Sequence, residues 1–268
     1  MSKPRQLTPQ EEARLAQVRK NFQERRQISE NLQSIKKKIG IYSGKGGVGK
    51  TTVATNLAIQ IAKSGFSVSI FDCDIDCPNV TKTLHISEGP IEKDSKLIPP
   101  SRHGVSVMSM SFFQEDEETA IIWRGPMIHN AINQFLHSTQ WGQLDFMIVD
   151  LPPGTSDAPL TVMQTLQLDG FIVVTTPQDL AALDAKRSIN MIRKLNLEVI
   201  GIVENMSGDI FGRGAGEEIS KSMGIPFFGS IELRKDYKTS KSPTVLESED
   251  VEKEYSTISN NLLSNLNF

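Results

Sequence analysis

Residues 38–52, with the sequence KIGIYSGKGGVGKTT, decide the fold of this chain. The apolar run 39–43 predicts a buried strand, and an octet that matches G-x-x-x-x-G-K-[ST] at every fixed position follows it directly. Apolar residues then recur at helical spacing over residues 51–64. This order predicts a phosphate-binding loop, because glycines let backbone N–H groups curl around a polyphosphate at a helix N-terminus. A glycine-rich turn that merely contains a lysine is the alternative, and the flanking strand and helix argue against it.

The residue types in this loop suit a nucleotide and magnesium. Lys50 places a positive charge on the outer phosphates, and the Thr51 hydroxyl can bind Mg²⁺. Lys45, next to the first glycine, is a second lysine that the general pattern does not require. The predicted nucleotide-binding residues of the loop are Gly44, Lys45, Gly46, Gly47, Val48, Gly49, Lys50, Thr51 and Thr52.

The composition is that of an ordinary folded protein. The chain has 268 residues, of which 38% are hydrophobic and 23% charged, so it can bury one large core. No apolar run approaches the roughly 20 residues that span a membrane, and the N-terminal residues do not resemble a signal peptide. Two cysteines do not make a disulfide framework. We therefore expect a cytoplasmic protein that binds no membrane.

The net charge of −3 is unevenly spread along the chain. Residues 1–38 contain ten Lys or Arg against four Asp or Glu, but glutamates and apolar residues are interleaved among the basic ones. This pattern favours a solvated helix over a nucleic-acid surface, so we expect no nucleic-acid partner. We divide the chain into an N-terminal helical arm, residues 1–35, and a nucleotide-binding domain, residues 36–268.

Three aspartates follow predicted strands. Asp72 and Asp74 come after the apolar run 68–71, and extended backbone places both carboxylates on one face, towards the same Mg²⁺ and water. Four apolar residues precede Asp150, a pattern typical of a carboxylate that reaches Mg²⁺ through water. The stiff loop 151–157 follows as a predicted switch that senses the terminal phosphate. The predicted metal residues are Thr51, Asp72 and Asp150, some of them acting through water.

Strands and helices alternate along the rest of the chain. The apolar strands predict a doubly wound, mostly parallel α/β sheet covered by helices on both faces. We expect a loop over residues 87–104 and a short strand over residues 121–123. Asn205 ends a later strand, where its amide can pair with a purine edge, and the absence of an N-K-x-D motif argues against guanine.

With these motifs identified, the chain resembles the Mrp/ApbC family of iron–sulfur cluster carrier ATPases, within the MinD/ParA-like class that has the extra lysine. The similarity covers about residues 30–245. It is carried by SGKGGVGKTT at 43–52, Asp72-x-Asp74, WRGP at 123–126, DLPPGTSD at 150–157, TPQ at 176–178, ENMS at 204–207 and GIPFFGS at 224–230.

The resemblance implies ATP hydrolysis by a homodimer that serves a protein partner or apo-protein client. It implies three catalytic residues: Lys50 on the phosphates, Asp74 positioning the attacking water, and Lys45 reaching the nucleotide of the other subunit. It further implies Mg²⁺ supported by Asp72 and Asp150, and adenine contacted by Asn205.

The resemblance also implies an iron–sulfur cluster held by a C-x-x-C pair soon after the ENMS motif, and here the sequence departs from the family. Ser207 runs through Gly208 and Asp209 without a cysteine. Alternation along the strand points Cys73 into the core, which leaves Cys77 as the remaining candidate ligand. Two hypotheses follow: a carrier ATPase, or a cluster-free ATP-dependent switch that acts on a protein partner.

Overall fold

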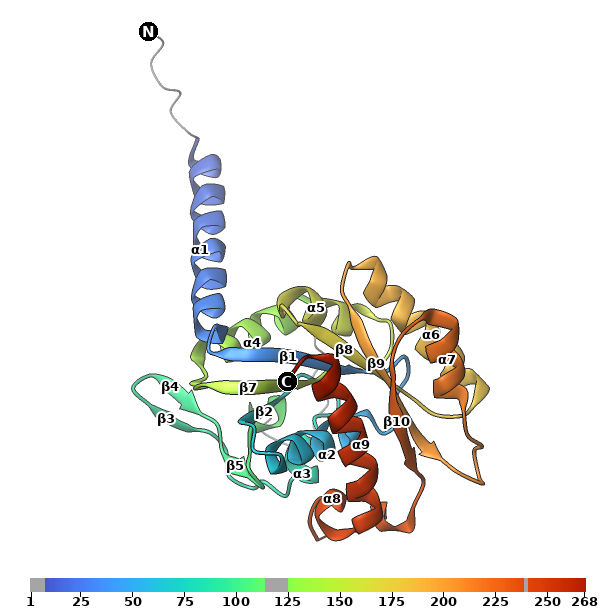
Figure 1. Cartoon of the computed structure of the whole chain (residues 1–268). Helices are drawn as coiled ribbons and strands as arrows, with labels where there is room; N and C mark the ends of the chain where they lie inside the picture. Colours follow the sequence, from blue (N-terminus) through green and yellow to red (C-terminus); the bar gives the residue numbers. More distant parts are fainter. Residues whose placement is uncertain (1–7, 114–124, 239–240) are drawn as a thin grey trace.

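A computed structural model describes residues 8–113, 125–238 and 241–268 of the chain (Figure 1). Its centre is an eight-stranded sheet in the order β10-β9-β8-β1-β7-β2-β6-β5, parallel except for the pairing of β5 with β6. The strands are β1 (Ile35–Tyr42), β2 (Val68–Asp72), β5 (Ser101–Arg102), β6 (Val105–Ser109), β7 (Leu144–Asp150), β8 (Gly170–Thr175), β9 (Val199–Ser207) and β10 (Phe227–Glu232).

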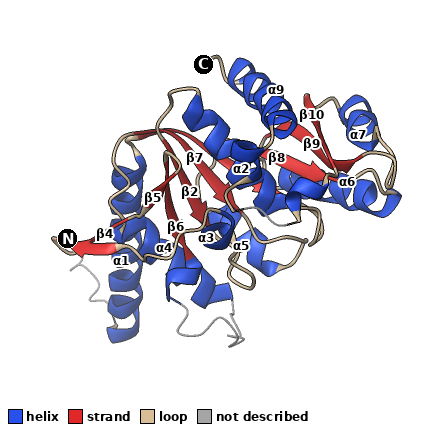
Figure 2. Cartoon of the chain, turned by 90° about the horizontal axis from the view of Figure 1, so that it is seen from below, coloured by secondary structure: helices blue, strands red, loops and turns tan. Residues whose placement is uncertain are grey.

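Helices cover both faces of this sheet (Figures 1 and 2). One face carries α2 (Lys50–Lys63), α3 (Val80–Thr83), α8 (Thr244–Glu247) and α9 (Glu249–Asn265). The other carries α4 (Gly125–Ser138), α5 (Asp157–Thr165), α6 (Asp179–Lys194) and α7 (Ala215–Met223). The predicted doubly wound α/β fold is confirmed. None of the helices in the described ranges is both long and apolar enough to cross a membrane.

Two hydrophobic cores follow from strand alternation. In β7, Met147 and Val149 pack into the core beneath α4 to α7, whereas Phe146 and Ile148 pack into the core beneath α2 and α9. Because both faces are covered, both sets of side chains must be apolar, and the strand reads as a continuous apolar run instead of an alternating one. The same sheet brings the carboxyl ends of β1, β2 and β7 together.

The N-terminal arm is one helix, α1 (Pro9–Leu32), which projects away from the sheet (Figure 1). It begins with a capping box, in which Thr8 and Glu11 bond to each other's backbone N–H. Its C-terminal end is anchored: Ile28 is buried, and the Asn31 amide donates to two carbonyls of the α4 end, at 2.6 and 2.9 Å. Further out along α1, the side chain of Val18 is 57% exposed.

The expected loop over residues 87–104 is wrong in part. It contains an antiparallel hairpin of β3 (Ile91–Lys93) and β4 (Lys96–Ile98). Asp94 and Ser95 form its two-residue turn with φ of 50° and 59°, the left-handed conformation that favours a tight hairpin. The short strand expected over residues 121–123 lies outside the described residues. Two 3₁₀ helices, η1 (Met110–Phe113) and η2 (Lys235–Tyr237), complete the elements.

Asp145 links the starts of three strands. Its carboxylate accepts hydrogen bonds from the Ser67 N–H and hydroxyl, both at 2.8 Å, and from the Lys36 ammonium at 2.7 Å. The Lys36 bond, followed by the Ser67 bonds, lowers the pKa of Asp145 from 3.8 to about 2. A carboxyl whose pKa is lowered by folding stabilises the folded state above its unfolded pKa, and that contribution is lost as the pH falls through the folded pKa.

We predict that Asp145→Asn lowers the free energy of unfolding by about 1 kcal/mol at neutral pH, because it removes charge-assisted hydrogen bonds. The difference from the parent should shrink as the pH falls from 3.8 towards 2. Urea unfolding of both proteins, from neutral pH down to about pH 2, measures this difference in the free energy of unfolding. A difference that is the same at neutral pH and near pH 2 would contradict the assignment.

Candidate functional site

The glycine-rich loop lies where the sequence predicts it, between β1 and α2. Gly49 precedes the first residue of α2 with a φ of 81°. A Cβ atom there would lie 2.2 Å from the amide nitrogen of Asn205, so the position needs glycine for both its conformation and its close neighbour. Backbone N–H groups at the start of α2 therefore face the mouth of the loop, as anion binding at a helix N-terminus requires.

Lys50 is the centre of the charge network. Its ammonium lies 2.6 Å from Asp150 Oδ1 and 3.7 Å from Asp74 Oδ2. Burial alone would lower the pKa of Lys50, but the Asp150 and Asp74 carboxylates outweigh it, so the pKa is raised. The Thr51 hydroxyl donates to the other oxygen of Asp150 at 2.6 Å. The end of β7 thus holds the first two residues of α2.

Asp72 lies opposite Asp150 in the register of β2 and β7. One of its oxygens accepts hydrogen bonds from the Ser109 hydroxyl at 2.9 Å and the Val80 N–H at 3.2 Å. Burial, reinforced by the Asp150 charge, raises the pKa of Asp72 to about 8. Burial also raises the pKa of Asp74 to about 6, against the effect of Lys50. Three buried carboxyl groups share one ammonium, and the raised pKa values of Asp72 and Asp74 reflect their burial and the shortage of positive charge in the site.

This donor set fits a magnesium ion. A bound divalent cation supplies the charge that Lys50 alone does not, and the hard oxygens of Thr51 and Asp150 are of the type that Mg²⁺ prefers. Within the described ranges, no group of three or more His, Cys, Asp or Glu side chains is placed to hold a metal ion. The protein oxygens therefore suit Mg²⁺ that takes its remaining ligands from phosphates and water, which is its usual mode of binding.

The loop is contacted from both sides by other strand ends. The Asn205 amide donates to the Val48 carbonyl at 2.8 Å. On the other side, the Gly154 N–H donates to the Ser43 carbonyl at 3.0 Å, and the Tyr42 hydroxyl donates to the Gly154 carbonyl. The predicted switch loop 151–157 is thereby attached to the strand that carries the phosphate loop.

Lys45 lies at the rim of the site. With Gly46, Gly47 and Val48 it lines a small pocket whose other lining residues are Thr176, Gln178, Met206 and Phe211. Among the residues that the structure describes, no carboxylate pairs with its ammonium. Lys45 therefore differs from Lys50, whose charge is neutralised within the chain.

Sequence reasoning missed two residues of this site. Ser109 bonds Asp72 from the end of β6, and Tyr42 bonds the switch loop from the end of β1. Both are hydroxyl-bearing residues at the last position of a strand, which is the signal that could have identified them. In a parallel sheet, such positions gather at the ligand-binding edge.

Of the two cysteines, Cys73 lies in the core, where strand alternation predicts it. Cys73 is fully buried in the core beneath α4, and burial, with the nearby Asp72 charge, raises the pKa of its thiol well above the ordinary value. Cys77 is exposed. Where the resemblance implies a cysteine pair, Gly208 and Gly212 close a short turn by donating to each other's carbonyls, at 2.9 and 2.7 Å.

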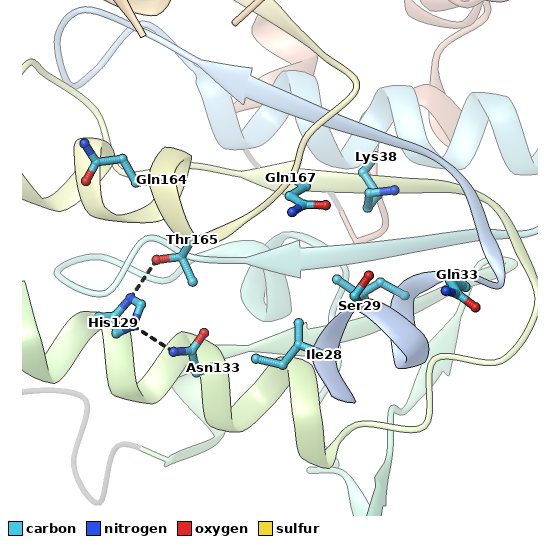
Figure 3. A pocket seen from close by; sticks show the side chains of 10 residues that line it. Ile28, Ser29, Gln33, Lys38, His129, Asn133, Gln164, Thr165 and Gln167 are labelled. Atoms are coloured by element: carbon cyan, nitrogen blue, oxygen red, sulfur yellow. Dashed lines mark hydrogen bonds between the residues drawn. The ribbon is translucent and has the colours of Figure 1, made fainter. Parts of the chain in front are cut away.

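A larger pocket lies elsewhere, between the base of α1 and helices α4 and α5 (Figure 3). His129 is one of the lining residues. Its Nδ1 lies 2.9 Å from the Thr165 hydroxyl, and its Nε2 lies 2.9 Å from the Asn133 amide nitrogen. The Asn133 amide donates to Nε2, so Nδ1 carries the proton and donates to Thr165. No residue of the phosphate loop lines this pocket. It is separate from the charge network around Lys50.

The chain matches known proteins over most of its length. Residues 34–266 match the family described as ParA: NUBPL iron-transfer P-loop NTPase. The iron–sulfur cluster carrier protein of Methanocaldococcus jannaschii is 45% identical over 219 residues, which are 77% of this chain and 76% of that protein. The carrier protein of the same description from Synechocystis sp. is 41% identical over 220 residues, 76% of this chain and 62% of its own length.

Solved structures agree with the fold. A nucleotide-binding protein in complex with ADP from Archaeoglobus fulgidus has a TM-score of 0.69 and 33% identity, and the match covers 88% of this chain and 92% of that one. The cell division ATPase MinD of Pyrococcus furiosus has a TM-score of 0.67, with 85% and 99% covered. At 21% identity, the second likeness shows the fold alone.

Gly44 gives a test of how tightly the loop is packed. A Cβ atom at Gly44 would lie 2.3 Å from the Asp184 carbonyl oxygen and 2.5 Å from the Ser188 hydroxyl, whereas at Gly46 the nearest atom, on Pro153, is 3.9 Å away. Neither glycine has a positive φ. We predict that Gly44→Ala lowers the free energy of unfolding by about 1–3 kcal/mol through overpacking.

Gly46→Ala is the matched control for this loop and should unfold at nearly the parental urea concentration. Urea unfolding without nucleotide measures both variants. Equal midpoints for the two variants would show that α6 does not press against Gly44 as described.

Proposed function

The chain belongs to the family of NUBPL iron-transfer P-loop NTPases, and from this membership we propose that it binds ATP and Mg²⁺ at residues 44–52 and hydrolyses ATP as a homodimer. The observation that carries the proposal is the buried network in which Lys50 and Thr51, the two chemically active residues of the loop, share the carboxylate of Asp150. Nucleotide hydrolysis is the activity typical of this family. The residue roles and the dimer are our proposals.

Lys50 changes partner when the nucleotide binds. Its ammonium is paired with Asp150 at 2.6 Å, and the phosphates of ATP offer it a stronger, multiply charged partner at the loop. Magnesium, when bound, neutralises phosphate charge that develops during transfer. Thr51 and Asp150 are the residues that would hold it, with Asp72 supporting Asp150 from the neighbouring strand. The exchange keeps every buried charge compensated.

Asp74 is the residue we propose for positioning the attacking water. Its carboxylate lies 3.7 Å from the Lys50 ammonium, too far for a hydrogen bond, so it retains acceptor capacity. The Cys77 N–H donates to its other oxygen at 3.3 Å, which fixes its direction. Phosphoryl transfer requires mainly positioning and electrostatics, so a buried, oriented carboxylate suffices for this role.

Asn205 has a further role in this proposal. Its amide nitrogen donates a hydrogen bond to the Val48 carbonyl, so the side chain helps to hold the phosphate loop in its conformation. Its contact with adenine stays a prediction, and the amide oxygen is the atom that would accept from the purine amino group.

Lys45 acts across the dimer in our proposal, because its ammonium finds no carboxylate in the described part of its own chain and lies at the rim of the loop. A cation supplied to developing phosphate charge from a second subunit can raise turnover by orders of magnitude. One subunit would then complete the other's site.

We predict that Lys45→Ala and Asp74→Ala each bind nucleotide but lose at least about 90% of ATP turnover, since both groups act on the transition state. Mixing the two variants should restore part of the activity. A mixed dimer contains one site with an intact Asp74 and an intact Lys45 from the partner. Phosphate release before and after mixing measures the recovery of ATP turnover.

Mixed dimers must be shown to form, for example by co-purification on two different tags. If confirmed mixed dimers recover no activity, Lys45 acts within its own chain or not at all. An Asp74→Ala protein that hydrolyses ATP at the parental rate would remove Asp74 from the mechanism.

The cargo is a separate question from the ATPase. The relatives named above are iron–sulfur cluster carrier proteins, which supports an iron–sulfur client for this chain. A [4Fe–4S] cluster between two subunits needs about four thiolates. This chain has two cysteines, of which Cys73 is buried as a thiol and Cys77 is exposed in a loop. We infer an ATP-dependent switch that serves an iron–sulfur partner without holding a cluster at the family's usual position.

We predict that anaerobic reconstitution with iron and sulfide leaves the parent protein without a stoichiometric cluster, because the turn 208–212 offers no thiolate. Absorption and EPR spectra, with iron and sulfide analysis, measure the content. Cys77→Ser is the matched variant and should give the same spectra as the parent. A stoichiometric cluster in the parent that is lost in Cys77→Ser would make residues 73–77 a cluster site and overturn the cluster-free reading.

A further inference from the structure

The short turn that replaces the cysteine loop exposes two large apolar side chains. We call residues 208–212 the apolar turn. Ile210 at its tip is 75% exposed, the highest exposure of any large hydrophobic residue in the described part of the chain, and Phe211 is 36% exposed. Leaving such side chains in water forfeits their burial energy, so neighbouring exposed apolar residues commonly mark an interaction site.

The turn is held rigidly, so the exposure is built into the fold. Gly208 and Gly212 exchange two backbone hydrogen bonds at its base. Arg213 forms an ion pair with Glu232 beside it. The buried Glu204 carboxylate accepts from the Gly214 and Gly216 N–H groups, at 3.0 and 2.7 Å, which fixes the chain as it enters α7. A preorganised turn pays little conformational entropy when it binds.

The turn lies at the mouth of the nucleotide site. Phe211 and Lys45 line the same pocket, together with Gln178, the residue that precedes α6. In its first turns, α6 exposes Leu180 at 72% and Leu183 at 45%, on one side of the helix because they are three residues apart. Apolar side chains from the apolar turn and from α6 therefore flank the rim where Lys45 lies.

We propose that the apolar turn and the first turns of α6 form the apolar part of the contact with a second copy of this chain, over the nucleotide. The inference rests on the proposed homodimer and names the residues that hold it together. Lys45 supplies the first reason for a second copy as occupant. Its ammonium has no carboxylate within the described residues, and Lys45 lines the same pocket as Phe211 and Gln178, so a subunit that covers this rim brings its own phosphates to it.

Charge supplies the second reason. A two-fold contact places each surface against itself, so an excess of one sign would repel the second copy. Here charged residues of both signs lie next to the apolar groups: Asp209 and Asp179 precede Ile210 and Leu180 in the chain, and Lys45 lines the same pocket as Phe211. Arg213 pairs with Glu232, and Arg187 pairs with Asp184 at 3.0 Å. An apolar centre surrounded by charges of both signs, including these two ion pairs, can meet its own copy without an excess of one sign.

The contact is also connected to the bound nucleotide. Asn205 bonds the phosphate loop at Val48, and Met206, the next residue, has a φ of 57°, which is uncommon for a residue with a side chain. The apolar turn begins two residues later. A shift of the phosphate loop on ATP binding therefore moves a short, fixed segment that leads directly to Ile210. The apolar surface is positioned to respond to the nucleotide.

The test compares dimer formation by Ile210→Ser, Leu180→Ser and the control Ile91→Ser. Ile91 is 70% exposed in the β3–β4 hairpin, so it matches Ile210 in residue type and exposure but lies away from the loop. Sedimentation of the full chain is measured with a non-hydrolysable ATP analogue and Mg²⁺, and with ADP. Binding of a fluorescent ATP analogue to dilute protein reports nucleotide affinity separately.

We expect Ile91→Ser to dimerise like the parent. Ile210→Ser should raise the dimer dissociation constant about a hundredfold, roughly tenfold for each of the two symmetry-related side chains, with nucleotide affinity of the monomer unchanged. Leu180→Ser should raise the constant at least about tenfold. A parent that dimerises with the ATP analogue while Ile210→Ser and Leu180→Ser dimerise equally well overturns this inference and assigns the surface to another protein. A parent that stays monomeric with the analogue overturns the proposed homodimer itself.

Discussion

A single buried ammonium, that of Lys50, faces three buried carboxylates at the carboxyl ends of β2 and β7. Burying an ion is costly unless it is paired, so this arrangement constrains everything around it. The sheet must be parallel, because only then do the ends of β1, β2 and β7 meet at one edge. Hydrogen bonds must supply the stabilisation that one ammonium cannot. Ser109 donates to Asp72, and Thr51 donates to Asp150. The excess negative charge makes the site receptive to a divalent cation, and the loop beside it receptive to the phosphates that such a cation accompanies.

The same edge of the sheet distributes the effect of a ligand. The phosphate loop is bonded to Asn205 at the end of β9 and, through Ser43 and Tyr42, to Gly154 in the loop after β7. These two attachments run in opposite directions along the sheet. One leads to the apolar turn, and the other to the start of α5. A movement of a few tenths of an ångström in the loop is therefore not absorbed locally, because packed elements transmit displacements instead of compressing. These two attachments are sufficient to couple the nucleotide to a subunit contact.

Much of the fold could be predicted from the sequence because its signals are local. The loop pattern and the apolar strands each extend over fewer than about ten residues, and the phosphate loop and the strands form where these patterns lie. The hairpin of β3 and β4 escaped prediction because its turn is Asp94-Ser95, which adopts the left-handed conformation without the glycine that usually signals it. Within the site, the partners of the predicted residues could not be assigned. That Ser109 bonds Asp72, or Tyr42 bonds Gly154, depends on which strands become neighbours in the sheet, and sequence spacing does not contain that information.

The absence of a cysteine pair after Ser207 limits the kind of bond that could join two subunits in the proposed dimer. A cluster shared between subunits is a set of metal–thiolate bonds, strong, directional and dependent on the redox state of iron and sulfur. Apolar contacts through Ile210 and Leu180 have neither direction nor redox dependence, and their strength scales with the area that they bury. A dimer joined in this second way is controlled by whatever moves the apolar surfaces into register, and the element that lies next to them is the phosphate loop. In the dimer that we propose, the ATPase machinery would therefore decide when the subunits associate, whereas in a thiolate-bridged dimer the cluster shares that control.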